Sequence, residues 1–455
     1  MTRRARRPHA VVVSGSRHID DAAMNRFHVR VAAYTTGGYF CDGYILGSIG
    51  LVIPMISGPM GLGPLWQGLI GASALAGITL GALIFGPITD RVGRQKILVF
   101  DLVVFVVASL AQLFVQGPVL LLVLRLVLGM AMGADYAIGP ALLAEFVPAR
   151  RRGTLLSSLN MVWTIGFVAS YGTGLWIQAA GGDDAWRWML ASGAVPALIT
   201  LALRLGTPES PRWLVAQGRV EEARKIVKTH IGPEYDVAPA PPAAEPPRYR
   251  ELFSVRYRRR LIFAGVFWLC QVFPYFGIGT FLPSVLGALG MGDGLTGEIW
   301  YNVILAVGAV GGFLVMDLLP RRRFTIWSFA IVAVALLMLA VRPDGPIGYV
   351  LPTLLVLALV ISAAADLESV YPAEVFPTEV RASGVGLAAA ISRVGAAVST
   401  FVMPGILAGA GVGVTMLVLL GVVLAGLVVS VLYAPETRHV RLSEAAGAAG
   451  ERSSA

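Results

Sequence analysis

Charged residues are scarce in this sequence. Only 14% of its 455 residues are Asp, Glu, Lys or Arg, whereas 56% are hydrophobic and the mean hydropathy is +0.73. A soluble globular protein has roughly 25% charged residues. Many apolar runs also approach the ~20 residues that a helix needs to cross a bilayer. These features exclude an ordinary soluble domain and predict an all-α integral membrane protein.

Cysteine, histidine and lysine are scarce as well. The two cysteines, Cys41 and Cys270, lie inside apolar runs and provide no disulfide framework. The five histidines fall outside the hydrophobic segments and form no HExxH pattern, so we expect no metal site. None of the three lysines follows a glycine, which excludes a phosphate-cradling GK[ST] loop. We therefore expect no cofactor, and an enzyme is excluded because no nucleophile, base or metal set converges.

The apolar runs predict twelve membrane-crossing helices. They cover about 30–56, 65–88, 97–116, 118–147, 154–180, 186–206, 260–289, 297–319, 324–341, 346–376, 383–409 and 412–433. The predicted organisation is a basic tail at 1–29, a six-helix bundle at 30–206, a linker loop at 207–259, a second six-helix bundle at 260–433 and a tail at 434–455. The linker contains a short predicted helix at 219–230 and a proline-rich stretch at 239–253.

The distribution of positive charge predicts the orientation. With both termini in the cytosol, every Lys and Arg falls in a tail or a cytosolic turn except Arg125, Arg187, Arg342 and Arg393. Such asymmetry follows the positive-inside rule. It assigns the net charge of +9 to topology rather than to a nucleic-acid surface. The basic N-terminus lacks a long apolar core before residue 30, and we expect a cytosolic tail rather than a cleaved signal peptide.

The two halves of the chain repeat each other. AEFVPARRRG at 144–153 recurs as AEVFPTEVRASG at 373–384, DRVGRQK at 90–96 as DLLPRRR at 317–323, and PESPRW at 208–213 as PETRHV at 435–440. Glu374 thus lies 229 residues after Glu145, and Asp317 lies 227 after Asp90. Six helices followed by six in the same orientation form a parallel repeat, an architecture known among transporters.

These motifs carry a family resemblance over residues 30–440. The sequence resembles the major facilitator superfamily, and within it the "sugar and other" transporter group. The turn GPITDRVGRQKIL, the run RLVLGMAMGADYAIGPALLAEFVPARRRG, PESPRWL and YPAEVFPTEVRASG all resemble hallmarks of that group. The resemblance implies two six-helix bundles that move between outward-facing and inward-facing states. The group transports sugars, phosphate, organic acids and organic cations, so the resemblance leaves the substrate open.

The charged residues of these motifs at the cytosolic helix ends are predicted to gate this movement. Salt bridges there would form in the outward-facing state and break in the inward-facing one. The alternative is that these charges only set the topology. The predicted gating residues are Asp90, Arg91, Arg94, Glu145, Arg152, Asp317, Arg321, Glu374 and Arg381.

Two carboxylates lie near the middle of the membrane. Asp42 and Asp135 are each about 18 Å from the cytosolic ends of their helices, where a charge is costly unless it faces a cavity or a partner. True sugar porters have GYD in helix one, where this chain has GYI with Ile45. In phosphate:proton symporters an acid occurs one turn earlier, as at Asp42, and their helix-four GDYP resembles ADYAIGP. The resemblance implies proton coupling by Asp42 and Asp135, with Arg125 nearby. The alternative is a fixed ion pair with Arg125 or Arg393.

The family fold implies that helices one, four, seven and ten line a central cavity. Helix seven has CQVFPYFGIG where sugar porters have a QQLSG-like element, which weakens the sugar interpretation. Asp366 and Glu368 in helix ten would make the cavity acidic, which favours a cationic or amine-bearing solute or one entering with protons. The predicted cavity residues are Tyr39, Tyr44, Asn160, Trp163, Trp268, Gln271, Tyr275, Asp366, Glu368 and Arg393.

The leading hypothesis is a monomeric plasma-membrane symporter that takes up a small polar or charged organic solute with protons. The proton gradient would be the energy source. Its partners would be the solute, protons and the lipid bilayer, with no nucleic acid. A proton-driven exporter of a drug or secondary metabolite could use the same acids, and a non-transporting receptor could use the same fold.

Overall fold

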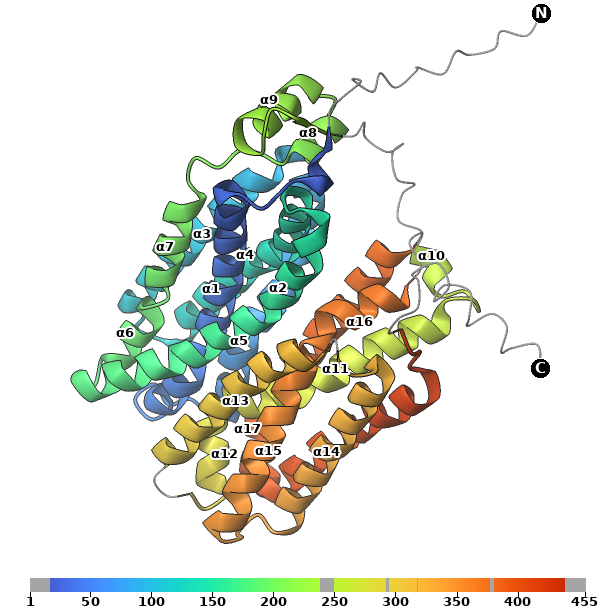
Figure 1. Cartoon of the computed structure of the whole chain (residues 1–455). Helices are drawn as coiled ribbons and strands as arrows, with labels where there is room; N and C mark the ends of the chain where they lie inside the picture. Colours follow the sequence, from blue (N-terminus) through green and yellow to red (C-terminus); the bar gives the residue numbers. More distant parts are fainter. Residues whose placement is uncertain (1–16, 238–248, 292–293, 317, 377–379, 438–455) are drawn as a thin grey trace, which may run out of the picture.

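Two successive bundles of long helices make up the protein, which is described by a computed structural model over residues 17–237, 249–291, 294–316, 318–376 and 380–437 (Figure 1). The N-half contains α1 (Arg26–Ser57), α2 (Pro64–Val92), α3 (Arg94–Ala111), η2 (Gln112–Phe114), α4 (Pro118–Phe146), α5 (Ala149–Ala180), α6 (Ala185–Ala191) and α7 (Ala194–Arg204). The C-half contains α10 (Tyr249–Leu252), α11 (Arg258–Thr280), α12 (Leu282–Ala288), α13 (Gly294–Val315), α14 (Arg321–Val341), α15 (Ile347–Ala365), α16 (Leu367–Val375) and α17 (Arg381–Tyr433).

Eleven continuous segments of the described residues are helical, long and apolar enough to cross a membrane. They match the twelve predicted spans because α17 contains the last two of them. This helix turns at Gly411, whose φ of 79° is readily adopted only by glycine. Gly93, with φ of 108°, similarly separates α2 from α3. The twelve-span prediction therefore agrees with the structure.

Three predicted spans are interrupted rather than continuous. The sixth divides into α6 and α7, the seventh divides at Phe281 into α11 and α12, and the tenth divides at Asp366 into α15 and α16. Phe281 leaves helical geometry with φ −115° and ψ 29°. Breaks in membrane helices are tolerated where neighbouring helices cover the backbone.

Small residues allow the closest helix contacts. α2 and α4 pack backbone to backbone, and a Cβ at Gly81 would overlap the carbonyl oxygen of Met130. In the reverse direction, a Cβ at Gly129 would overlap the carbonyl oxygen of Ala74. Small residues commonly bring membrane helices together in this way because lipid supplies no hydrophobic driving force. These close contacts hold α4, which carries Asp135, against α2.

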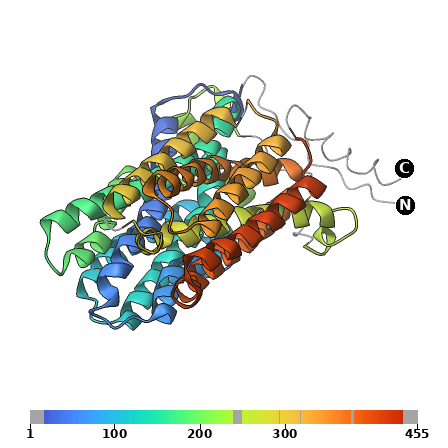
Figure 2. The same cartoon turned by 90° about the horizontal axis from the view of Figure 1, so that it is seen from below.

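The two halves lie side by side and touch mainly through α2 against α17 and α5 against α13 (Figures 1 and 2). We call the end of the molecule that carries α8, α9 and the start of α1 the tail face, and the opposite end the far face. Contacts near the far face are close: a Cβ at Gly68 would overlap the carbonyl oxygen of Phe401, and the Tyr171 hydroxyl donates to the Gly279 carbonyl at 3.3 Å. Towards the tail face the two bundles diverge (Figure 1).

The linker between the halves packs on the tail face of the N-half. It contains α8 (Pro211–Ala216), α9 (Val220–His230) and β2 (Tyr235–Asp236), and α9 matches the predicted helix at 219–230. A segment that we call the N-terminal strap, residues 17–25, contains β1 (Arg17–His18) and η1 (Ile19–Asp21). β1 pairs in parallel with β2, and the Asn25 side chain donates to the His230 carbonyl at 2.8 Å. The strap thus ties the linker to the start of α1.

Candidate functional site

A small pocket lies between the two halves in the middle of the molecule. Its volume is about 30 Å³, enough for a water molecule but not for a metabolite. The lining residues are Tyr136, Asn160, Trp163, Thr164, Val272, Tyr275, Phe276, Ala365, Glu368 and Arg393. They come from α4 and α5 of the N-half and from α11, α15, α16 and α17 of the C-half. Ligand entry therefore requires these side chains to move apart.

Polar contacts order the walls of this central pocket. The Trp268 indole N–H donates to Oε2 of Glu368 at 2.7 Å, which fixes the carboxylate within the C-half. The Arg393 guanidinium lies 4.6 Å from the centre of the Tyr136 ring, a cation–π contact between the halves. The Asn160 amide donates to the Ala365 carbonyl at 3.1 Å, also across the halves. The pocket thus presents one carboxylate and one guanidinium.

Five of the ten predicted cavity residues line this pocket, and the other five lie elsewhere. Tyr39 lies behind Tyr136, with ring centres 5.2 Å apart, and Trp268 supports Glu368 from the side. The Gln271 amide donates to the Ile361 carbonyl at 2.7 Å, inside the C-half. The Tyr44 hydroxyl is 2.8 Å from the Ser192 hydroxyl, at the break between α6 and α7.

Asp366 does not face the pocket, although Glu368 two residues later does. A Cβ at Gly312 of α13 would lie 2.5 Å from Oδ2 of Asp366. The carboxylate therefore occupies the interface between α13 and the helix break, where glycine leaves room for it. The expectation that both acids make the cavity acidic is wrong for Asp366.

Asp42 and Asp135 come together inside the N-half, behind the pocket. Both are at most 1% exposed. A Cβ at Gly38 would overlap Oδ2 of Asp135, so the carboxylate of α4 lies directly against α1, one turn before Asp42. Among the described residues the Asp42 oxygens have no hydrogen-bond partner. A buried carboxylate without a donor is costly when ionised and much less so when protonated.

Two further charged residues, Asp101 and Arg204, complete this buried cluster, and neither is among the site residues predicted from the sequence. Arg204 at the end of α7 has nitrogens 3.6 Å from Asp101 of α3 and 3.8 Å from Asp135. Arg204 is fully buried and also covers the Tyr34 ring at 5.0 Å. Asp101 lies within a predicted span, so its intramembrane position was a usable signal. The sequence places Arg204 with the cytosolic charges because its Cα lies at the helix end.

Arg125 is separate from the acidic cluster. It is fully buried, and its guanidinium donates to the Ile45 carbonyl at 3.4 Å. Nε and Nη2 have no hydrogen-bond partner among the described residues. The arginine thus contacts the backbone of α1 three residues after Asp42. The structure does not bring Arg125 into ion-pair distance of Asp42 or Asp135 within the described part of the chain.

The tail face carries matching ion-pair networks in the two halves. Arg94 pairs with Glu145, which also accepts from the Ser210 hydroxyl, and the Gln95 backbone N–H donates to Glu209 at 3.1 Å. In the C-half, Arg321 pairs with Glu374 at 3.5 Å, Thr437 donates to Glu374 at 2.5 Å, and the Arg322 backbone N–H donates to Glu436 at 3.3 Å. These partners follow the repeat of 227–229 residues found in the sequence. We call each network a tail-face cap.

The expected opening and closing of these ion pairs stays a prediction, and the structure shows which of them are formed in one arrangement of the halves. Arg94 and Glu145 both belong to the N-half and are paired here, although the bundles diverge at this end. This pair is thus formed within one half, in an arrangement in which the two bundles diverge at the tail face. Arg152 pairs with Asp20 of the N-terminal strap rather than with Glu145.

The remaining predicted gating residues have varied positions. Arg91 is exposed, and Arg381 donates from Nε to the Phe376 carbonyl at 3.1 Å. Asp90 directly follows Thr89, where the membrane-crossing part of α2 ends. The Asp90 side chain is not described, and Asp317 lies outside the described residues. Across the described part of the chain, no group of three or more His, Cys, Asp or Glu residues is arranged to hold a metal ion.

Curated relatives cover nearly the whole chain. A family model described as "Sugar (and other) transporter" matches residues 31–448. The inner membrane metabolite transport protein YgcS of Escherichia coli K12 is 44% identical over 432 residues, which is 95% of this chain and 97% of YgcS. The putative metabolite transport protein YaaU of the same organism is 37% identical over 432 residues, 94% of this chain and 97% of YaaU.

Solved structures share the fold at low sequence identity. A partially occluded inward-open structure of the E. coli xylose transporter XylE has a TM-score of 0.76 and 20% identity, covering 92% of this chain and 100% of that one. An inward-open XylE structure has a TM-score of 0.75 at 20% identity, covering 92% and 99%. The predicted fold class, two six-helix bundles related by a parallel repeat, is confirmed.

Proposed function

Because this chain belongs to the sugar (and other) transporter family of the major facilitator superfamily, and is a multi-pass membrane transporter rather than an enzyme, we propose that it couples uptake of a small polar organic solute to proton entry. The solute would bind in the central pocket, and the halves would alternate in exposing it. The asymmetry of positive charge supports a cytosolic tail face and a cytoplasmic-membrane location. A single chain contains both proposed sites, so we propose that it works as a monomer.

The observation that carries this proposal is the buried pair of Asp42 and Asp135. The Asp135 carboxylate of α4 lies against Gly38 of α1, which is one helical turn before Asp42, and two buried carboxylates placed this close cannot easily both be ionised. Arg204 compensates part of this negative charge but is also shared with Asp101. One carboxylate of the pair is therefore suited to take up a proton and release it as the access side changes.

The proton site and the solute site are neighbours on one helix. Asp135 belongs to the buried cluster, and Tyr136 lines the central pocket under Arg393. A change in the charge of Asp135 is thus one residue from the contact that joins α4 to α17. Movement of Arg393 away from Tyr136 on solute binding would alter the packing of the helix that holds Asp135. We propose this contact as the coupling element.

The polar groups of the pocket favour a solute with two kinds of functional group. Glu368 accepts hydrogen bonds or binds an amine, and Arg393 binds a carboxylate or another acceptor. Asn160 and Thr164 add neutral polar groups, and Trp163, Tyr275 and Phe276 add aromatic faces. With Asp366 turned away, the balance of one acid and one cation favours a neutral or zwitterionic metabolite over a simple cation.

The test begins with ligand discovery on the purified protein. A solute that binds only the folded state raises thermal stability, so a panel of sugars, organic acids, amines and zwitterions identifies the ligand class. Proteoliposomes then separate binding from coupling. The wild type should accumulate the solute when the outside is acidic, and Asp42→Asn should retain counterflow but lose accumulation. Undiminished accumulation in Asp42→Asn would contradict the assignment, and proton-driven depletion in the wild type would indicate an exporter.

A further inference from the structure

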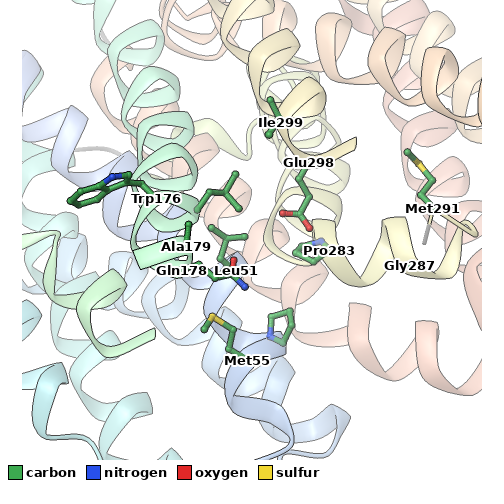
Figure 3. Close-up of a pocket in the computed structure, with 12 residues that line it drawn as sticks. Leu51, Met55, Trp176, Gln178, Ala179, Pro283, Gly287, Met291, Glu298 and Ile299 are labelled. Carbon is green, nitrogen blue, oxygen red and sulfur yellow. The ribbon is translucent and has the colours of Figure 1, made fainter. Parts of the chain in front are cut away.

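A second cavity, of about 740 Å³, opens between the halves at the far face (Figure 3). Small-molecule sites commonly enclose about 300–1,000 Å³ and are mostly apolar with a few placed polar groups. This cavity is lined by Leu51, Pro54, Met55, Leu175, Trp176, Gln178, Ala179, Pro283, Gly287, Met291, Glu298 and Ile299. We call it the far-face vestibule. It is separate from the central pocket and shares no lining residue with it.

Glu298 is the charged residue of the vestibule. Glu298 is only 7% exposed. Figure 3 shows its carboxylate extending from α13 into the space between α5 and α12. Within the part of the chain that the structure describes, the carboxylate makes no hydrogen bond or ion pair. The carboxylate oxygens are therefore not enclosed by protein but face the space of the vestibule, where a cation would meet a negative charge that no described protein group neutralises. The aliphatic and thioether side chains around it, including Leu51, Met55 and Met291, suit an apolar ligand body.

We infer that the far-face vestibule binds a small organic ammonium ion through Glu298. The ammonium would contact the carboxylate, and the apolar body would lie against the side chains of α1 and α12. Gln178, at the end of α5, supplies one further polar group. The central pocket instead offers both a carboxylate and a guanidinium, so the two sites select different chemistry.

The vestibule has walls from both halves, and this has a functional consequence. α1 and α5 belong to the N-half, whereas α12 and α13 belong to the C-half. A ligand bridging them favours the arrangement in which these walls have their present spacing. It would therefore oppose the movement that separates the far face. On the orientation in our proposed function, an external ammonium ion would inhibit transport without competing for the central pocket.

The binding test uses benzyltrimethylammonium and the full chain in phosphatidylglycerol nanodiscs. Isothermal titration should show saturable binding to the wild type and at least tenfold weaker binding to Glu298→Gln. Gly287→Phe should also weaken binding, because a Cβ there meets nothing within 4 Å and a ring can fill the cavity. The matched control, Ala288→Phe, places the same ring on the adjacent exposed residue, which does not line the vestibule, and should bind as the wild type does.

Several outcomes would overturn the inference. The carboxylate is not a ligand site if the probe binds the wild type and Glu298→Gln with equal affinity, or if its binding to both is non-saturable. Loss of binding in Glu368→Gln with none in Glu298→Gln would place the probe in the central pocket. Choline headgroups share the ammonium chemistry, so a second titration in phosphatidylcholine nanodiscs tests the source. Weaker binding there identifies the headgroup as a competing occupant, and unchanged binding identifies a free amine.

A transport assay separates this inference from the proposed function. External benzyltrimethylammonium should lower the maximal rate of solute uptake by the wild type without changing its KM, and should not affect Glu298→Gln. Uptake that is proton-driven but insensitive to the probe would contradict only the vestibule site. Probe binding without any proton-driven uptake would contradict only the proposed function.

Discussion

The N-half and the C-half have the same tail-face cap but different charges inside the membrane. Arg94, Glu145 and Ser210 in one half correspond in sequence and in contacts to Arg321, Glu374 and Thr437 in the other. Both caps therefore belong to the repeated fold. By contrast, Asp101 and Arg204 correspond at the offset of 227 to Ser328 and Val431, so the buried charge cluster belongs to the N-half alone.

This difference suggests a division of labour. The N-half holds Asp42 and Asp135, which are buried away from the pocket, while the C-half supplies the pocket with Glu368 and Arg393. Proton chemistry then needs only one bundle, whereas solute binding needs both. An arrangement of this kind lets the two sites communicate through the interface rather than by sharing ligands. The following experiments challenge that division, from the largest expected effect to the smallest.

Removal of the cation from the N-half cluster should have the largest effect. Arg204→Gln leaves Asp101 and Asp135 buried without their arginine, and loss of one partner of a buried ion pair costs about 3–5 kcal/mol. Arg393→Gln, the matched change in the C-half, loses a half-buried cation–π contact of about 1 kcal/mol. Free energies of unfolding from SDS titration of both variants measure the difference.

A double variant keeps that test informative if Arg204→Gln does not fold. Asp101→Asn with Arg204→Gln removes one uncompensated carboxylate together with the cation, so it should recover part of the loss. Equal destabilisation by Arg204→Gln and Arg393→Gln, or no recovery in the double variant, would argue against a charge cluster confined to the N-half.

Neutral replacements of one acid from each half should separate coupling from binding. Asp135→Asn should reduce the proton-driven accumulation ratio to about one while solute exchange at equilibrium continues. Glu368→Gln should keep accumulation but raise the KM about 10- to 100-fold, because a hydrogen bond to a charged group contributes about 1.5–3 kcal/mol. Accumulation and exchange in proteoliposomes measure both. The reverse pattern would exchange the roles of the two halves.

The tail-face caps should respond equally in the two halves. Glu145→Gln and Glu374→Gln each weaken an arginine pair and a hydroxyl contact, so each should cost about 1–2 kcal/mol of unfolding free energy. Both side chains are partly exposed, which keeps the effect below that of Arg204→Gln. A cost more than twice as large in one half would show that the caps are not equivalent.

The shared features are the ones that the sequence predicted well. The hydrophobic runs predicted the spans, and the repeated motifs predicted the residues of both caps. Depth along the helix also placed Asp42 and Asp135 at one level, which the structure confirms as neighbouring positions. These features depend on the order of residues along the chain, and simple counting can recover them.

The features that were missed depend on where side chains point. Arg204 begins at a helix end and reaches Asp101 and Asp135 inside the membrane, so its Cα position was misleading. Asp366 and Glu368 are two residues apart, which is roughly 200° around a helix, so they could not both face one pocket. That calculation was available from the sequence. The position of Asp366 against Gly312 could not be predicted from the sequence, because it depends on the packing of α13.

The smallest effect is expected at the N-terminal strap, which has no described counterpart in the C-half. Asp20 pairs with Arg152 and with Arg212, the latter at 2.6 Å, and its side chain is 29% exposed. Asp20→Asn should therefore lower stability by about 0.5–1 kcal/mol. Asp21→Asn, at the adjacent exposed residue, is the matched control and should have no effect. Thermal melts at low salt should separate the two variants, and at 1 M salt the difference should shrink because the screening length falls to about 3 Å. A salt-independent loss in Asp20→Asn would mean that the strap is held by the apolar contacts of Ile19 and Tyr235 and not by its ion pairs.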